Sequence, residues 1–247
     1  SASGSSVYVV WGSYDSTTSQ SFIFFRRSTD NGTSFSPPVA LMSSTVAIEI
    51  LFQSPQIAVS GSNVYITCRQ FFTRSTDNGA NFSTPVDLGK GEYGLTMAVS
   101  GSNVYVAWSE RVNPKSSDIF FARSTDNGAS FSSRNLTYNA DLVYSHFPQI
   151  AASGTNVYVT WSTFDMVGLW FLERPLSFVR STDWGINWSD PIDLGAGAHG
   201  QTMAVSGSNV YVAWTCANNV VFARSINNGA DFETPTALTN NFYGVDY

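Results

Sequence analysis

A short polar phrase returns five times along this chain of 247 residues, at intervals of about 50 residues. Three copies read STDNG, and the other two read STDWG and SINNG. They begin at Ser28, Ser75, Ser124, Ser181 and Ser225. Self-similarity at a period of about 20–50 residues is typical of solenoids, propellers and arrays, in which each repeat is one supersecondary unit. The repeat therefore constrains the fold more than any other feature.

Each copy of the phrase lies within a larger unit that has four strand-like runs. An apolar run of Val, Tyr and Trp precedes every copy, at Val7–Trp11, Val64–Cys68, Val104–Trp108, Val157–Trp161 and Val210–Trp214. A second apolar run leads into the phrase, a third follows it, and a run such as IAVSG leads into the next unit. Clusters of Ser, Gly, Asn and Asp separate the runs, and no stretch has a convincing helical period.

In the Val-Tyr run both the even and the odd positions are apolar, so both faces of the strand would be apolar. This pattern is typical of a strand buried on both faces. Four-stranded units arranged radially, with neighbours on both faces, predict an all-β fold, the β-propeller. An extended solenoid is the alternative, although its repeats normally have fewer and shorter strands. We expect a single domain over residues 1–247 with five four-stranded antiparallel blades. The expected repeat units are 1–53, 54–93, 94–146, 147–199 and 200–247.

The ends of the chain bear on how such a ring would close. The innermost run is complete in only four units, and SASG at the start and YGVDY at the end are interpreted as parts of the fifth. Pairing of the N- and C-terminal segments in one blade would close the ring without a free edge. The alternative is a fragment of a longer propeller. Cys68 and Cys216 are expected not to be bonded, because a disulfide needs Cα atoms within roughly 7 Å and their blades would not be neighbours.

The phrase and the aromatic residue three positions after its glycine resemble the Asp-box, or BNR repeat, of sialidase-like β-propellers. STDNGTSF, STDNGANF, STDNGASF and STDWGINW fit the motif, and SINNGADF has Asn227 where the motif has Asp. The resemblance covers the whole chain, since all five units carry the phrase. It implies the sialidase-like fold and says little about activity, because Asp-box propellers do many things.

The residue types of the phrase suit a tight turn between two strands. Ser and Asp side chains can bind nearby backbone N–H groups, and Gly can adopt a positive φ. The aromatic ring that follows is expected to fold into the seam between sheets. We therefore interpret five equivalent positions as structural, with a catalytic or metal role as the alternative: Asp30, Asp77, Asp126, Asp183 and Asn227.

Antiparallel alternation places the repeated turns at one end of the sheets and the variable connections at the other. On a repeated scaffold, variable loops usually carry the function. The candidate ligand-binding residues in these connections are Tyr93, His146, Trp170, His199, Arg69 and Arg111. The alternative for each histidine is a polar loop residue without a ligand. No metal and no cofactor is expected, because the two histidines have no metal-ligand spacing.

The resemblance to sialidases also implies a catalytic set: three arginines that hold a carboxylate, a Tyr nucleophile assisted by Glu, and an Asp acid/base. The R-I-P motif that carries the first arginine does not occur in this chain, and most sialidases are longer and six-bladed. The catalytic set is therefore not carried over. The remaining candidate catalytic carboxylates are Glu49, Glu92 and Glu173.

The charge and the hydropathy of the chain argue against some classes of binding partner. The net charge is −6, which argues against nucleic acid because phosphate binding needs a basic patch. No apolar run is long enough for membrane insertion. We expect a monomeric extracellular or cell-surface binding module that recognises a glycan or a protein. The alternatives are a sialidase-like exo-glycosidase or other carbohydrate-active enzyme with a non-standard site, and a structural repeat domain of a larger surface protein.

Overall fold

The computed structural model describes residues 1–44, 54–89, 93–139, 141–167, 170–196 and 199–239. Throughout these residues the chain is all β and has no helix, as the sequence predicts. A helix long and apolar enough to cross a membrane is accordingly not found among them. The chain forms two compact units. Unit 1 comprises Ser1–Val106 and Ala122–Ser133, and unit 2 comprises Ala107–Phe121 and Arg134–Tyr247. The single domain expected from the sequence stays a prediction.

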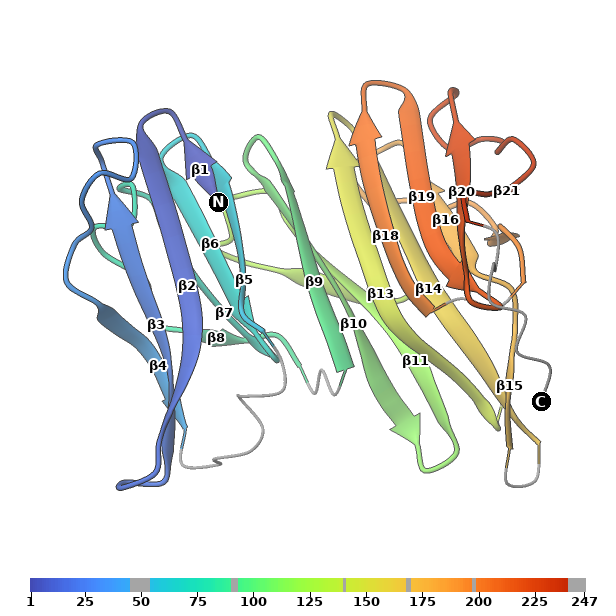
Figure 1. Cartoon of the computed structure of the whole chain (residues 1–247), viewed down its shortest axis with the longest axis horizontal. Helices are drawn as coiled ribbons and strands as arrows, with labels where there is room; N and C mark the ends of the chain where they lie inside the picture. Colours follow the sequence, from blue (N-terminus) through green and yellow to red (C-terminus); the bar gives the residue numbers. More distant parts are fainter. Residues whose placement is uncertain (45–53, 90–92, 140, 168–169, 197–198, 240–247) are drawn as a thin grey trace. The chain divides into compact units, whose positions relative to one another are not determined.

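In unit 1 the first two repeats each form a four-stranded sheet in sequence order (Figure 1). The first contains β1 (Ala2–Ser3), β2 (Ser6–Asp15), β3 (Gln20–Ser28) and β4 (Val39–Ser44). The second contains β5 (Gln56–Ser60), β6 (Asn63–Cys68), β7 (Phe71–Ser75) and β8 (Val86–Asp87). The third repeat contains β9 (Tyr93–Ser100), β10 (Asn103–Asn113), β11 (Ser116–Ser124) and β12 (Ser132–Asn135), and the boundary between the units passes through its last three strands.

In unit 2 the fourth and fifth repeats follow the same order. The fourth contains β13 (Val143–Ser153), β14 (Asn156–Val167), β15 (Trp170–Glu173), β16 (Ser177–Ser181) and β17 (Ile192–Asp193). Strand β15 is an added strand that pairs with the far end of β14. The fifth contains β18 (His199–Ser206), β19 (Asn209–Cys216), β20 (Asn219–Ser225) and β21 (Thr236–Ala237). Strand β13 begins at Val143, a few residues before the repeat boundary expected at 147.

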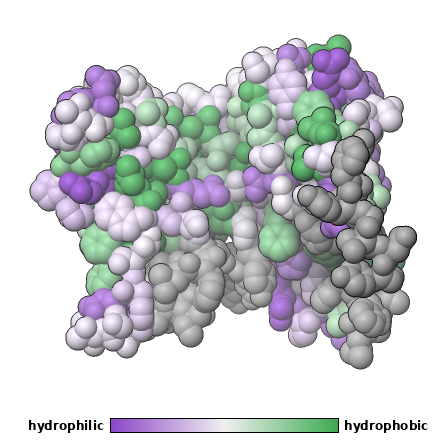
Figure 2. Space-filling view, in the orientation of Figure 1, coloured by the Kyte–Doolittle hydropathy of each residue, from purple (hydrophilic) through white to green (hydrophobic). Residues whose placement is uncertain are grey.

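In the second, third and fourth repeats the second strand of the sheet, β6, β10 or β14, is buried on both faces, as its apolar pattern predicts, whereas β2 and β19 are buried only in part. Val64, Tyr65 and Ile66 are successive residues of β6, and all three are fully buried. Both faces of such a strand are therefore covered, which explains why its sequence does not alternate. Val9 of β2 and Val39 of β4 are exposed, and apolar surface is visible over the first sheet at the left of Figure 2. Single apolar residues on a surface are ordinary and indicate no site.

The repeated turn is held by its serine and its aspartate. In the first repeat, Ser28 Oγ donates to Asp30 Oδ1 (2.6 Å) and accepts from Gly32 N (2.9 Å), while Asp30 Oδ1 accepts from Ser34 N (2.9 Å). The hydroxyl of Ser28 is the largest cause that lowers the pKa of Asp30 to about 2. The serine is buried and the aspartate is exposed.

The later copies of the turn have the same geometry, including the copy that departs from the motif. Asn227 Oδ1 accepts from Ser225 Oγ (2.8 Å) and from Asp231 N (3.1 Å), as an aspartate would. The contacts therefore support a structural role for this position in the turn.

In the second to fifth repeats the ring after the turn packs into the seam with the preceding sheet, as predicted. Phe82 meets Phe25 edge-on with centroids 4.8 Å apart, and Phe131 meets Phe72 in the same way at 4.9 Å. In unit 2, Phe178 and Phe232 repeat this contact at 4.8 Å. Edge-to-face pairs of this kind are worth about 0.5–1.5 kcal/mol beyond the area they bury.

The arginine before the turn also links neighbouring repeats. Arg27 Nη1 donates to Asn78 O (2.9 Å) and Arg74 Nη1 to Asn127 O (2.8 Å), both in unit 1. Each arginine thus reaches the turn of the following repeat, which supports a structural role for the periodic arginines.

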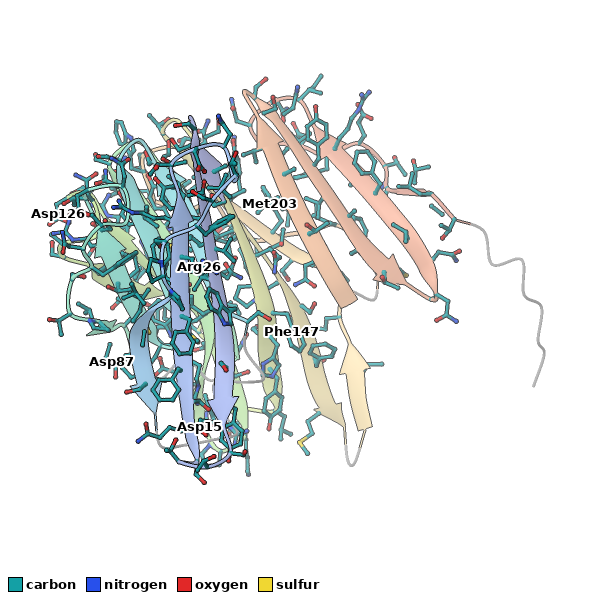
Figure 3. All side chains as sticks on the ribbon, turned by 60° about the vertical axis from the view of Figure 1, so that its left-hand side comes forward. Asp15, Arg26, Asp87, Asp126, Phe147 and Met203 are labelled. Atoms are coloured by element: carbon teal, nitrogen blue, oxygen red, sulfur yellow. The ribbon has the colours of Figure 1, made fainter. Side chains whose placement is uncertain are left out.

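The repeated turns gather at one end of the sheets. Asn31 N donates to Ser5 O (2.9 Å), and Trp184 N donates to Thr155 O (2.8 Å), so each repeated turn bonds the hairpin between the first two strands of its own sheet. In unit 1, Asp126 lies in the upper part of Figure 3, and Asp15, in the β2–β3 hairpin, lies at the lower end. The two classes of connection are separated, as strand alternation predicts.

Closure of the ring stays a prediction. The N-terminal segment forms β1 and pairs with β2, with Ala2 opposite Val7. The C-terminal segment Tyr243–Tyr247 lies outside the described residues, so the number of blades is likewise a prediction. Neither Cys68 nor Cys216 forms a disulfide bond, in agreement with the expectation that they are not bonded to each other.

Candidate functional site

Unit 2 carries exposed aromatic residues on unusual backbone. Phe147 in β13 has φ +54° and is 50% exposed, and Tyr138, in the loop before β13, has φ +50° and is 74% exposed. A residue with a side chain in this left-handed region is strained by about 1–2 kcal/mol. Such outliers concentrate at functional sites, where the surrounding structure holds them in place.

Phe147 occupies a position where two other repeats have glycine. Counted back from the hairpin between the first two strands, Phe147 corresponds to Gly94 and Gly200. Their φ values are +68° and +59°, so the three backbones adopt the same conformation. Phe147 therefore keeps a large exposed ring at a place where the backbone favours glycine. Figure 3 labels this residue on β13.

A buried glutamine holds the strained peptide. Gln201 of β18 donates from Nε2 to the carbonyl oxygen of Phe147. Its Oε1 accepts from Ser162 Oγ (3.2 Å) of β14, and both Gln201 and Ser162 are buried. The register of β13 against β14 shifts between His146 and Gln149, which is the bulge that turns Phe147 outward.

His146 lies beside Phe147 and is half-buried between hydroxyl groups. Its Nδ1 is 3.2 Å from Ser109 Oγ, and its Nε2 is 3.3 Å from Ser117 Oγ. The ring stacks on Tyr144 with centroids 6.1 Å apart. Burial, and then the charge of Arg111, lower the pKa of His146. The imidazole is therefore kept neutral at neutral pH, as a donor and acceptor of hydrogen bonds.

A polar cleft of about 190 Å³ opens in unit 2 between the loop after β12 and the variable end of the fourth sheet. The loop contributes Thr137 and Asn139, on either side of the exposed Tyr138. The fourth sheet contributes Trp161, Thr163, Arg174, Pro175, Ser177, Pro191 and Asp193. Asn139 also joins the cleft to the His146 region, because its Nδ2 donates to Ser145 Oγ (2.8 Å). The cleft thus combines aromatic and hydrogen-bonding groups.

The buried carboxylate of Asp118 in β11 fixes the loop that borders the cleft. It accepts from Asn135 Nδ2 (2.5 Å), Thr137 Oγ1 (3.0 Å) and the backbone N of Asn139 (2.7 Å). A buried charge is tolerated when several donors satisfy it. Asp118 is therefore a positioning residue for the two loop side chains of the cleft.

Arg174 is pre-oriented at the cleft by Asp165 of β14. Its Nε lies 2.8 Å from Asp165 Oδ2, and its backbone N donates to Thr163 O (2.9 Å). The Arg174 side chain is half-exposed, so the pair adds little to stability. A guanidinium carries five N–H donors, and this pair uses one of them. The arrangement can present further donors to a polar ligand.

The structure brings only some of the predicted site residues together. His146 and Arg111 lie close to each other in unit 2, whereas Arg69 lines a different cavity, in unit 1. Glu49 and Glu92 lie outside the described residues. For the others the structure places the backbone in a strand but does not describe the side chain: Tyr93 in β9, Trp170 and Glu173 in β15, and His199 in β18. Their roles stay predictions.

Sequence reasoning missed several residues of the site. The signal for Phe147 was present, since aligning SHFPQIAAS with EYGLTMAVS and AHGQTMAVS places Phe147 opposite two glycines. Trp161 was assigned to the periodic core, and nothing in its repeat distinguished it. Among the described residues, no group of three or more His, Cys, Asp or Glu side chains could hold a metal ion.

No protein-family model matches the sequence. A search of curated proteins gives no match either. Solved structures do match. An α-L-arabinanase of Penicillium chrysogenum complexed with arabinobiose is 11% identical with a TM-score of 0.59, covering 94% of this chain and 77% of that chain. The GH93 α-L-arabinofuranosidase of Fusarium graminearum with arabinobiose is 12% identical with a TM-score of 0.58, again covering 94% and 77%.

A protein of unknown function from Dyadobacter fermentans is also similar, at 14% identity and a TM-score of 0.55, covering 88% of this chain and 71% of that chain. At these identities the similarity concerns the fold. The chain shares the β-propeller fold of these hydrolases, which agrees with its four-stranded antiparallel sheets.

Proposed function

We propose that this chain is a carbohydrate-binding β-propeller of the Asp-box type, acting outside the cell or at its surface, and that it binds a sugar at the variable end of unit 2. The observation that carries the proposal is Phe147: an exposed ring on left-handed backbone, held by a buried glutamine, where other repeats have glycine. The ring meets His146 on one side, with centroids 5.8 Å apart, and leaves half of its surface exposed. A ligand that stacks on the ring gives the strain a function.

The chemistry of the polar cleft supports a sugar as this ligand. A sugar ring has an apolar face that stacks on aromatic side chains and a rim of hydroxyls that donate and accept hydrogen bonds. Trp161 supplies the aromatic wall of the cleft, Tyr138 is an exposed ring between the cleft residues Thr137 and Asn139, and Phe147 is a separate exposed ring of unit 2. Asn139, Arg174 and Asp193 supply a mixed set of donors and acceptors. Two of the similar structures hold arabinobiose, which makes pentose oligosaccharides the first ligands to test.

Hydrolysis of the bound sugar is the alternative function. Asp193 lines the cleft, and Asp165 is bonded to Arg174, which also lines it. Glycoside hydrolysis uses a pair of carboxyl groups that flank the scissile bond. Asp165 is bonded to Arg174, so its carboxylate serves to position the guanidinium. Binding without turnover is therefore the function that the described residues support best.

The test is a panel of oligosaccharides measured by isothermal titration calorimetry with the whole chain. The panel contains arabinobiose and longer arabino-oligosaccharides, xyloglucan oligosaccharides and sialyllactose, and reducing-end release is followed in parallel. Binding of at least one neutral oligosaccharide without release is expected. Release of reducing ends would show that the chain hydrolyses the sugar, and the alternative function, an enzyme, would then replace the proposed binding function. The absence of binding across the panel would reject a carbohydrate function at this site.

A further inference from the structure

An apolar cavity of about 250 Å³ lies in unit 1 between the first and second sheets. Its apolar walls are Ile23, Leu41, Met42, Cys68, Phe71 and Pro85. Ser43 and Arg69 complete the lining. The cavity is partly open to solvent, since Phe71 in its wall is 36% exposed, and its lining is nevertheless mostly apolar.

The cavity results from a change in the second strand of the repeat. Trp108, Trp161 and Trp214 end the Val-Tyr run in the third, fourth and fifth repeats, and all three are buried. Cys68 stands at this position in the second repeat. A thiol replaces an indole, and the volume that the ring would fill is left empty.

The walls that receive the tryptophan are nevertheless kept. In unit 2, Trp214 packs in one cluster with Leu176 and Leu194 of the preceding sheet. In unit 1, Cys68 packs with Ile23 and Met42. Met42 is paired with Ile23 in the first sheet, and Leu194 is hydrogen-bonded to Leu176 in the fourth sheet. Ile23 and Met42 therefore take the places next to Cys68 that Leu176 and Leu194 take next to Trp214.

We propose that this cavity is a binding site for a planar aromatic ring of indole size. Its walls are the equivalents of those that hold the tryptophan side chain elsewhere in the chain. A dry cavity of about 150 Å³ lined by aliphatic and aromatic side chains binds benzene, so about 250 Å³ admits a bicyclic ring. Burial raises the pKa of the Cys68 thiol to about 11, so this wall presents a neutral, polarisable sulfur.

The polar cleft of unit 2 lies in the fourth repeat at the place that corresponds to this apolar cavity in the second repeat. The residues that differ between the two places determine which ligand each favours. Cys68 pairs with Phe71 across the second sheet, as Trp161 pairs with Ser177 across the fourth. Pro85 and Pro191 follow their turns at the same distance. In the fourth repeat the tryptophan forms one wall of this place, and a cleft of about 190 Å³ lined largely by polar groups remains. In the second repeat the ring is absent and the walls are apolar, which favours an aromatic ligand over a sugar.

Indole is the probe for this site, with cyclohexanol as a non-planar control. Titration calorimetry of the whole chain should show saturable binding of indole and at least tenfold weaker binding of cyclohexanol.

Substitution tests the walls. Cys68→Trp supplies the missing ring and should weaken indole binding at least tenfold, whereas Cys216→Ser should leave it unchanged. If Cys68→Trp does not fold, Phe71→Ser, which introduces the residue of the fourth repeat at a partly exposed position, should weaken binding at least fivefold. The proposal is overturned if wild-type protein does not bind indole, or if the wall variants bind indole as wild type does.

Discussion

The packing of the repeated turn against its neighbour can be tested at Gly128. Its φ is +78°, and a Cβ placed there would lie 2.6 Å from Cζ and 2.8 Å from Cε1 of Phe72. The ring of Phe72 is buried and meets Phe131 edge-on at 4.9 Å, so it cannot move aside freely. The backbone strain of an alanine costs about 1–2 kcal/mol, and displacing a packed ring costs about 1–3 kcal/mol. Gly128→Ala is therefore expected to lower the free energy of unfolding by about 2–5 kcal/mol.

Gly101 is the matched control for this substitution. Its φ is +61°, and a Cβ there would meet nothing within 4 Å. Gly101→Ala thus introduces the backbone strain alone, about 1–2 kcal/mol. Urea denaturation of both variants and wild type, with slopes compared, gives the difference that belongs to the ring contact. Equal losses in the two variants would refute the packing of Phe72 on the turn.

Three further predictions concern stability. Ser75→Ala leaves the buried N–H of Gly79 without its acceptor and should lower the free energy of unfolding, measured with urea, by about 1–3 kcal/mol. Asp77→Ala removes an exposed carboxylate and should lower it by less. A larger loss for Asp77→Ala than for Ser75→Ala would contradict the assigned roles. The lowered pKa of Asp30, about 2, means that its contribution is present above its unfolded pKa of about 4 and is lost as pH falls to about 2, so melting temperatures should fall across that window. The lowered pKa of His146 means that only the unfolded chain takes up its proton as pH falls through about 6.5; stability should drop there, and less so in His146→Gln.

The fold was largely predictable because the same pattern of strands and turns recurs five times in the sequence. The Val-Tyr runs indicated strands buried on both faces, and β6 is buried in this way. The Ser-Asp-Gly phrase indicated a tied turn, and the hydrogen bonds of Ser28 and Asp30 are those of such a turn. Alternation also separated the repeated turns from the variable connections. Such features depend on neighbours in sequence, which a single chain displays.

The candidate site was less predictable because it depends on contacts between repeats. Nothing in the sequence around Gln201 shows that its amide holds the backbone of Phe147. The role of Asp118 as acceptor for a loop about twenty residues later is likewise visible only in three dimensions. The sequence shows that Cys68 replaces a periodic tryptophan, which is a signal for a cavity at this position. The volume of the cavity could not be predicted, because some of its walls come from another repeat.

The most direct test of the proposed function is calorimetric titration of a Phe147→Gly variant with the oligosaccharide that wild type binds best. Trp184→Gly is the control, because Trp184 is also an exposed aromatic residue with a positive φ but lies in a repeated turn. Phe147→Gly removes backbone strain, so the variant should melt at or above the wild-type temperature and yet bind the sugar at least tenfold more weakly. Trp184→Gly should bind as wild type does. Unchanged sugar affinity in Phe147→Gly would contradict the assignment of this site to carbohydrate.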